Sequence, residues 1–281
     1  MHNQAFNRIV AAVRRRQQRA WCYIRYLCSP KPMLAYGPCV TIFFDYEGKW
    51  ASPEAEASSR IGVLQVLDYL HEEGIRATFN VVGGLLVSEE TIIRRIINAG
   101  HEIASHTCWH EVVSSSSQCE MHDDIEGYRR LLAPYGVSLN GFRAPESRWS
   151  PPVIAALEEA GLRWDAEDDF APTPYIIRRS QSGGHLWRMP VVTDDWKIEG
   201  MQVPPAQMLV CWEEAVHGLL LQQRYGAIGF HPWILGKDPE RMLAFRAFLR
   251  FLRQQKKLSI LPFGEVARVC ESRLAPKEQP L

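Results

Sequence analysis

The feature that most constrains the fold of this chain is a regular alternation of strand-like and helix-like runs after Pro38. Short runs dense in β-branched and aromatic residues, as at 40–44 and 77–82, alternate with longer runs whose apolar residues recur at helical spacing, as at 59–73 and 153–160. Such alternation predicts parallel strands with helices outside them, joined by right-handed crossovers, as in a barrel or an open sheet. The chain has 281 residues, of which 46% are hydrophobic, and this is enough for an α/β fold of one domain.

Several helix boundaries follow from the residues expected to cap them. Gly74 and Gly100 end predicted helices, because glycine readily adopts the left-handed conformation that follows a helix. Ser150 and Asp238 each precede a proline, the pattern of an N-cap followed by a first-turn residue. Helical spacing in the run 59–73 predicts the burial of Ile61, Leu64, Leu67 and Leu70.

Two clusters of acidic and imidazole side chains follow predicted strands. Asp45 and Glu47 end the first strand, and His106 and His110 follow the strand predicted at 101–105. Residues two apart in a strand point the same way, so both carboxylates can reach one site. The two histidines can reach one divalent ion if their segment turns once like a helix, and with one carboxylate they would leave that ion open to water, as in a catalytic centre. The alternative is that the acids only cap the strand and hold no metal.

Four motifs in this order resemble those of the metal-dependent polysaccharide deacetylases, the NodB-homology group. They span Phe44 to Gly48, His106 to His110, Gly141 to Glu146 and Gly229 to Pro232. The resemblance implies a deformed (β/α) barrel and one divalent metal ion, with zinc favoured over cobalt, nickel and iron. The segments 189–196 and 230–237 look more like the branch of the family that contains allantoinases.

The resemblance also implies roles for single residues. Asp45 is the expected general base, and Glu47, His106 and His110 are the expected metal ligands, although the two carboxylates can exchange these roles. The commonest members of the family have an aspartate where this chain has Tyr46. A homologue that has lost its metal is therefore the alternative.

Arg143 and His231 complete the expected catalytic set. The matching arginine of the family holds the catalytic aspartate, a role that suits the guanidinium fork, and the alternative is a salt bridge at the rim. His231 is the expected general acid, because an ordinary pKa of about 6.5 lets an imidazolium protonate a leaving amine. Asp194 or Asp195 is expected to restrain His231, and we assign that role to Asp195.

Aromatic and motif residues indicate a sugar substrate. Tryptophan faces stack on sugar rings, and the backbone N–H beside the third motif can stabilise an amide oxygen. The candidate substrate-binding residues are Trp109, Pro145, Glu146, Trp196 and Trp233. We expect an N-acetyl or N-formyl amino sugar, carried on a nucleotide or a polyprenyl phosphate during cell-envelope polysaccharide synthesis. The alternatives are a small cyclic amide or ureide, as for allantoinases, and sugar binding without metal or catalysis.

The cysteines indicate a cytoplasmic protein. They number seven and are never spaced as a Cys-x-x-Cys ligand pair, which is typical of reduced thiols. Cys108 lies between two candidate ligands, but its position predicts that it points away from the metal. The chain also lacks the uninterrupted apolar run of a secretory signal or a membrane span.

The sequence divides into a basic amphipathic helical segment at 1–34, a barrel at 35–275 and a tail at 276–281. Through Lys31 the chain holds seven of its 32 Lys and Arg residues and none of its 32 acidic residues. Apolar residues recur there at about helical spacing: Phe6, Val10, Val13, Trp21, Ile24 and Leu27. This pattern predicts a helix that lies on an anionic membrane or, alternatively, packs on the barrel. Nucleic acid is not an expected partner, because the rest of the chain is acidic, and the oligomeric state is left open.

Overall fold

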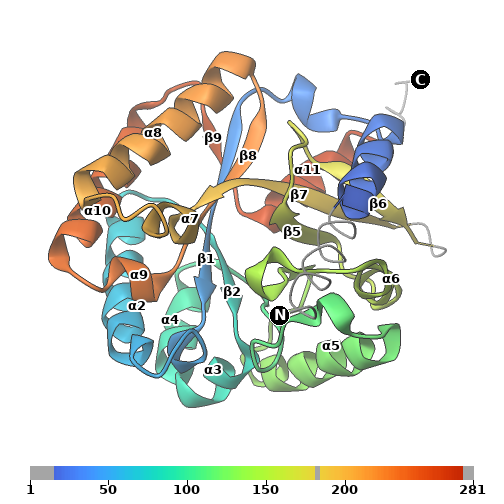
Figure 1. Ribbon diagram of the computed structural model, residues 1–281, viewed down its shortest axis with the longest axis horizontal. Coiled ribbons are helices and arrows are strands. Elements are labelled where there is room, and N and C mark those ends of the chain that lie inside the picture. The colour runs from blue at the N-terminus through green and yellow to red at the C-terminus, as the bar shows by residue number, and fades with distance from the viewer. Residues whose placement is uncertain (1–15, 181–183, 275–281) are drawn as a thin grey trace, which may run out of the picture.

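The computed structural model describes residues 16–180 and 184–274, which form a barrel surrounded by helices (Figure 1). Parallel strands close a ring in the order β1-β2-β3-β4-β5-β7-β8, and β8 pairs with β1 again. The strands are β1 (Cys39–Tyr46), β2 (Thr78–Val81), β3 (Glu102–Ser105), β4 (Gly141–Phe142), β5 (Trp164–Asp168), β6 (Tyr175–Arg179), β7 (His185–Asp194), β8 (Tyr225–Phe230) and β9 (Ser259–Ile260). The predicted α/β barrel is thus confirmed.

The ring is deformed at β1 and β7. Along one side of β1, β8 pairs with 39–44, while the other side is shared by β9 at 39–40 and β2 at 43–46. The strand β6 lies outside the ring and runs antiparallel to β7. The end of β1, where the first motif lies, is therefore held between β8 and β2.

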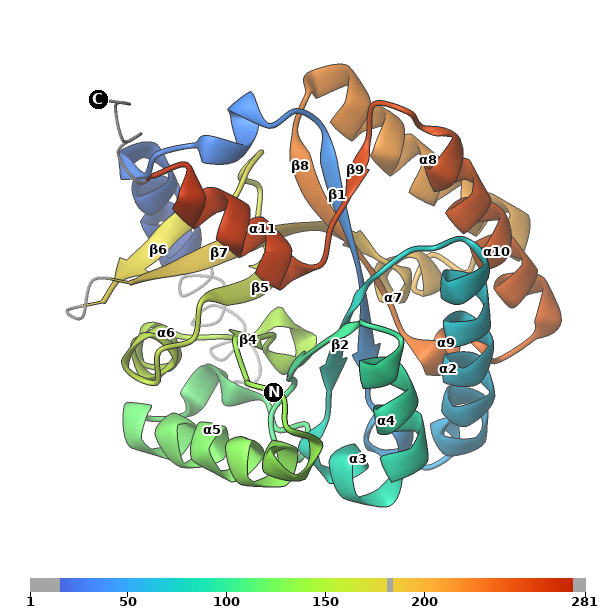
Figure 2. The same ribbon diagram turned by 180° about the vertical axis from the view of Figure 1, so that it is seen from behind.

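Helices cover the outside of the ring and one of its ends. They are α2 (Ala55–Glu72), α3 (Gly83–Ser88), α4 (Glu90–Asn98), α5 (Gln118–Leu132), α6 (Pro151–Glu159), α7 (Asp195–Glu199), α8 (Pro205–Gln222), α9 (Pro232–Leu235), α10 (Pro239–Gln254) and α11 (Phe263–Ser272), with single 3₁₀ turns η1 (Pro32–Ala35), η2 (Gly48–Trp50), η3 (Val113–Ser115), η4 (Ala133–Tyr135) and η5 (Pro145–Ser147). We call the end where the strands begin the base and the end where they finish the mouth. Figure 2 shows α11 crossing the face turned away in Figure 1, and its first residues donate backbone hydrogen bonds to Thr78 and Glu102, which begin β2 and β3.

Alternation along β1 separates two apolar cores. Phe43 belongs to the core inside the barrel, where it packs on Phe263 of α11. Phe44 and Tyr46 belong to the core between the barrel and its helices. Burial on both sides explains why β1 is largely apolar. Asp45 shares the inward direction of Phe43, since residues two apart in a strand face the same way.

Two close contacts hold α9, the short helix that follows His231. A Cβ added to Gly62 of α2 would lie 1.9 Å from the carbonyl oxygen of Pro232. A Cβ added to Gly236 would lie 2.0 Å from the carbonyl oxygen of Ser58. Because only glycine leaves room for such contacts, both positions require it. The loop that carries His231 is thereby fixed against α2.

Residues 16–28 form a helix beside β6. The Trp21 ring lies 5.9 Å from the Trp149 ring, and the Tyr26 ring lies 5.9 Å from that of Tyr175 on β6. One side of this helix therefore packs on the barrel, as the alternative reading of the sequence predicted. Within the described ranges, no helix combines the length and the apolar character needed to cross a bilayer. Phe6, Val10, Val13 and the tail at 276–281 lie outside the described residues.

One burial prediction is wrong. Ile61 is 55% exposed, because α2 turns Gly62, Val63 and Val66 toward the core instead. Helical spacing alone leaves the phase of the buried face open by about one residue when apolar residues are dense. The short helix α3 before α4 was not predicted either.

Candidate metal centre and active site

Glu47, His106 and His110 form a group that could hold a metal ion. One ligand atom from each lies within 4.8 Å of the others. Glu47 Oε1 lies 3.1 Å from His110 Nε2 and 3.5 Å from His106 Nε2. Glu47 and His106 are buried, while the His110 side chain is partly exposed. The set has two imidazoles and one carboxylate, which are ordinary ligands of divalent zinc and leave positions open.

The hydrogen bond at His106 Nδ1 orients the ring as a metal ligand would require. Its Nδ1 lies 2.9 Å from the carbonyl oxygen of Arg143, which can only accept, so Nδ1 carries the hydrogen. Nε2 then carries the lone pair in the neutral ring. Among the described residues this Nε2 is buried and has no hydrogen-bond partner. A buried polar atom left without a partner needs an explanation, and a metal ion at this position supplies one.

The loop that carries the two histidines does not turn like a helix, so that expectation is wrong. Thr107 and His110 both have left-handed backbone, with φ of 62° and 63°. Backbone hydrogen bonds from Gly83 and Gly84 to the carbonyls of Thr107 and Cys108 hold this shape. Cys108 points away, with its Sγ 3.3 Å from the carbonyl oxygen of Asp124. These contacts bring the two imidazole centroids within 5.1 Å.

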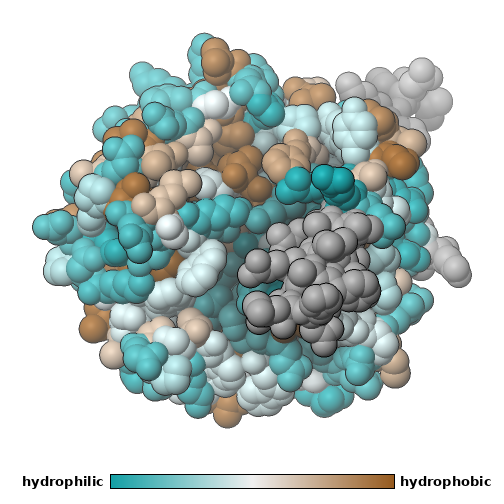
Figure 3. All heavy atoms as spheres, viewed as in Figure 1, coloured by the Kyte–Doolittle hydropathy of each residue, from teal (hydrophilic) through white to brown (hydrophobic). Residues whose placement is uncertain are grey.

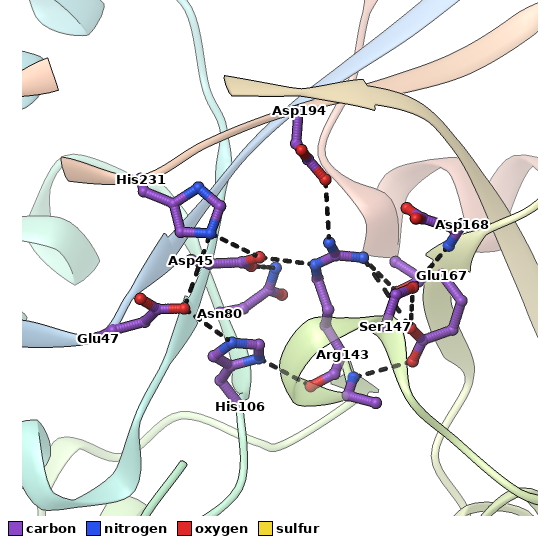
Figure 4. A network of polar contacts seen from close by, with 12 residues as sticks. Asp45, Glu47, Asn80, His106, Arg143, Ser147, Glu167, Asp168, Asp194 and His231 are labelled. Atoms are coloured by element: carbon purple, nitrogen blue, oxygen red, sulfur yellow. Dashed lines mark hydrogen bonds and ion pairs between the residues drawn. The ribbon is translucent and has the colours of Figure 1, made fainter. Parts of the chain in front are cut away.

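Asp45 lies in the mouth with both oxygens hydrogen-bonded (Figure 4). Arg143 Nε donates to Oδ2 and Asn80 Nδ2 donates to Oδ1, each at 2.7 Å. Burial would raise the pKa of Asp45, but the Arg143 guanidinium and nearby histidines outweigh it, so the pKa is lowered. Asp45 is therefore held as a carboxylate, separate from the triad of Glu47, His106 and His110.

Arg143 is buried and makes several contacts, so it is not a salt bridge at the rim. Its Nη1 donates to the Ala166 carbonyl at 3.1 Å, and its Nη2 lies 3.7 Å from Asp194. Its Nη1 also lies 4.0 Å from Glu167. Glu167 accepts hydrogen bonds from the Ala144 backbone and the Ser147 hydroxyl, and burial raises its pKa to about 8. These contacts fix the guanidinium against Asp45.

His231 is held by Asp195. Asp195 Oδ1 lies 2.6 Å from His231 Nδ1, and Oδ2 accepts from the His231 backbone at 2.8 Å. His231 Nε2 then lies 3.7 Å from both Asp45 Oδ2 and Glu47 Oε1. Burial would lower the pKa of His231, but Asp195, Glu47 and Asp45 raise it. Asp194, the other candidate partner, caps α7 instead.

The predicted aromatic residues lie around this group. Trp109 and Trp196 are 54% and 58% exposed, and the Trp196 ring is 6.5 Å from that of His231. The Trp233 indole donates to Glu47 Oε2 at 3.0 Å, so it fixes the carboxylate of the triad. Trp50, which the sequence analysis missed, lies 6.2 Å from Trp109. In the space-filling view, hydrophilic residues line a recess at the centre of this face (Figure 3).

At the end of the third motif, Pro145 and Glu146 contribute backbone atoms to the site more than side chains. Pro145 is buried, while the Glu146 side chain is exposed and pairs with Arg148. Glu146 and Ser147 have positive φ, 55° and 53°. Such strained backbone in residues other than glycine is typical of functional loops.

Sequence reasoning missed Asn80 and Glu167. Both are buried polar residues inside strands: Asn80 lies between Phe79 and Val81, and Glu167 lies between Ala166 and Asp168. A polar residue between apolar neighbours of a buried strand is an informative signal, and it could have marked Asn80.

Comparisons with known proteins agree with the motifs. Residues 38–164 match the model of the polysaccharide deacetylase family. A chitooligosaccharide deacetylase of Bradyrhizobium sp. (strain ANU 289) is 34% identical over 100 residues, which are 34% of this chain and 45% of the relative. The chain thus spans less than half the length of this curated relative.

Solved structures share the fold. A protein of Pseudomonas aeruginosa PAO1 assigned to the polysaccharide deacetylases superposes with a TM-score of 0.76 at 19% identity, covering 90% of this chain and 96% of the other. Puue allantoinase superposes with a TM-score of 0.75 at 18% identity, covering 86% and 94%. The resemblance predicted from the motifs is confirmed by the match of residues 38–164 to this family's model.

Proposed function

We propose that this protein is a metal-dependent hydrolase that removes an acetyl or formyl group from the nitrogen of an amino sugar. The observation that carries the proposal is the unpartnered His106 Nε2, buried beside Glu47 and His110 and next to the separately held Asp45 and His231. A divalent ion there, most simply zinc, would polarise the acyl oxygen and lower the pKa of water to about 7.

Two residues of the chain would move protons in this reaction. Asp45 is held as a carboxylate by Arg143 and can accept a proton from the attacking water. His231 is positioned by Asp195 with its Nε2 directed at the same space, and it can donate a proton to the leaving amine. A raised pKa keeps His231 protonated for that step.

The exposed tryptophans support a sugar as the substrate. Trp109 and Trp196 are exposed, and the Trp50 and Trp233 rings lie 6.2 Å and 5.9 Å from them, respectively. Aromatic faces bury the apolar side of a sugar ring well. Pro145 and Glu146 would border the acyl group, with the Glu146 backbone N–H near the developing oxygen charge.

The first test is metal content. Glu47→Ala, His106→Ala and the matched control His122→Ala, which alters an exposed histidine of α5, would be purified alongside the native protein. We expect about one divalent ion per chain in the native protein and the control, and a loss in both site variants. Acetate release from N-acetylated oligosaccharides should follow the metal. Absence of metal after reconstitution with zinc or cobalt would contradict the proposal and favour the non-catalytic alternative raised by Tyr46.

We further propose that the sugar is carried on a polyprenyl phosphate or a nucleotide, and that the protein works in the cytoplasm on an anionic membrane surface. The helix at 16–28 exposes Tyr23, Ile24 and Leu27 by 62%, 59% and 56%, on the side turned away from the barrel. Exposed apolar side chains in a segment that is basic and free of acids fit an anionic lipid surface.

Vesicle sedimentation would test this membrane contact. We expect binding to vesicles that contain phosphatidylglycerol and little binding to pure phosphatidylcholine. The double variant Ile24→Glu/Leu27→Glu should lose binding, while Leu221→Glu/Leu243→Glu, at exposed sites of α8 and α10, should keep it. Equal binding by both double variants would show that this helix is not the contact.

A small cyclic amide or ureide is the second candidate substrate. The segment 230–237 favours it, because it is similar to the allantoinase branch and places Trp233 on the triad. An enzyme of this kind would hydrolyse allantoin without vesicles and would tolerate Ile24→Glu/Leu27→Glu. Turnover of N-acetyl sugars but not of allantoin would exclude it.

A further inference from the structure

Asn80 occupies a place in the mouth that neither the motifs nor the proposed chemistry assigns. It lies on β2 directly beside Asp45 of β1 in the parallel register, and it is fully buried. Its Nδ2 donates to Asp45 Oδ1 at 2.7 Å. Because a carboxylate only accepts, this contact determines which way the amide points, and Asn80 Oδ1 faces away from Asp45.

Asn80 and Arg143 together occupy both oxygens of Asp45. Arg143 Nε donates a hydrogen bond to Asp45 Oδ2 at 2.7 Å. A carboxylate held by charge-assisted or buried hydrogen bonds on both oxygens is fixed in rotation. Glu47 differs, since the Trp233 indole occupies Oε2 while Oε1 faces the two imidazoles.

We propose that Asn80 is a positioning residue that keeps Asp45 out of the metal's ligand set and leaves Glu47 as the metal carboxylate. The proposal rests on the metal site of the proposed function. It decides which of the two carboxylates binds the metal, a choice that the spacing of Asp45 and Glu47 leaves open. Without the amide, Asp45 Oδ1 is free to turn toward the ion.

Zinc affinity in a double-mutant cycle tests the proposal without any substrate. Native protein, Asp45→Ala, Asn80→Leu and the double variant would compete with a chromophoric chelator for zinc. We expect Asp45→Ala to change the zinc Kd by less than about threefold in the native background and to weaken it at least about tenfold in the Asn80→Leu background. If Asn80→Leu does not fold, Asn80→Ser removes the same donor without adding bulk.

Thr78→Val provides a matched control. Thr78 lies two residues earlier on the same strand, also buried, and its hydroxyl donates to the Glu102 carboxylate at 2.7 Å. This variant loses a similar hydrogen bond at the other end of the barrel. We expect its zinc Kd to stay unchanged, with the same small effect of Asp45→Ala as in the native background.

Steady-state kinetics supply a second readout. Asn80→Leu should lower kcat about tenfold to a hundredfold with KM within about threefold, because the base loses its orientation while substrate binding does not use it. A kcat loss no larger than that of Thr78→Val would overturn the positioning role.

Failure of the Asn80 role and failure of the metal site would give different results in these measurements. Equal effects of Asp45→Ala in both backgrounds, or loss of zinc in Asp45→Ala alone, would overturn the role of Asn80 while the metal site stands. Unchanged zinc binding in Glu47→Ala would instead contradict the assigned ligand set, and with it this inference.

Discussion

At the base of the barrel, the buried Glu102 and His101 contact uncharged donors, whereas at the mouth His231 lies beside the carboxylates of Asp45 and Glu47. Glu102 at the base accepts from the Thr78 hydroxyl, the Trp164 indole and the Gly264 backbone. Burial raises the pKa of Glu102 and lowers that of His101 to about 4, so both shifts favour neutral groups.

Three groups at the mouth shift in the opposite sense, although burial raises the pKa values of the neighbouring Glu167 and Asp195. The pKa values of Asp45 and Glu47 are lowered and that of His231 is raised, because opposite charges outweigh the burial that opposes them. The base thus uses polar groups to join α11 to the strands, while the mouth keeps Asp45, Glu47 and His231 charged. Perturbed charges in a recess of this kind are typical of active sites.

The sharpest way to test this comparison is Asp45→Asn. The amide keeps an oxygen for Arg143 but cannot act as a base, so we expect kcat/KM to fall about 1,000-fold. Metal content should stay at the native level. Activity within a few-fold of native would contradict the role of Asp45 as general base. The charged groups at the mouth would then have no demonstrated part in catalysis.

Asp195→Asn should have the next largest effect. Without the carboxylate, the His231 ring loses the partner that orients it and favours its charged form, so kcat should fall about a hundredfold. The alkaline limb of the pH profile should move to lower pH, because the pKa of His231 would no longer be raised by this neighbour. A native profile would show that His231 titrates independently of Asp195.

At the base, His101 should govern part of the acid sensitivity of folding. Its pKa is lowered from 6.5 to about 4 by burial, so the unfolded chain binds a proton that the folded chain excludes. The free energy of unfolding therefore carries the full contribution of His101 above about pH 6.5. This contribution falls as the pH drops toward 4, by at most about 3 kcal/mol.

Urea unfolding of the native protein and His101→Asn at pH 7 and at pH 4.5 would measure this loss. The variant should lose less stability between the two pH values than the native protein does. His122→Asn, an exposed control, should behave like the native protein.

Glu102→Gln should have the smallest effect on activity and a moderate one on folding. The amide keeps one acceptor but turns its NH₂ group toward a donor, which should cost about 1 to 3 kcal/mol of unfolding free energy. We expect kcat and zinc content within about twofold of native, since Glu102 lies at the far end of the barrel. A large loss of activity would show that the two ends are coupled.

Most of the side chains that meet at the mouth were predicted from the sequence, because the signals that mark them are local. Acids and histidines that follow apolar strands are visible without a structure, because parallel strands bring their ends to one edge. Asn80 was missed, because its role depends on the register between β1 and β2. The shape of the loop at 106–110 was predicted wrongly, because left-handed backbone at Thr107 is imposed by hydrogen bonds from a distant segment.

The sequence by itself determined the barrel and most of the residues that meet at its mouth, because hydrophobic periodicity and strand-end motifs are local properties. Only the tertiary structure decided which side of the helix at 16–28 faces the barrel, which aspartate holds His231 and which atoms hold Asp45. These depend on contacts between residues far apart in the chain, whose geometry is set by strand register and packing and leaves no local pattern.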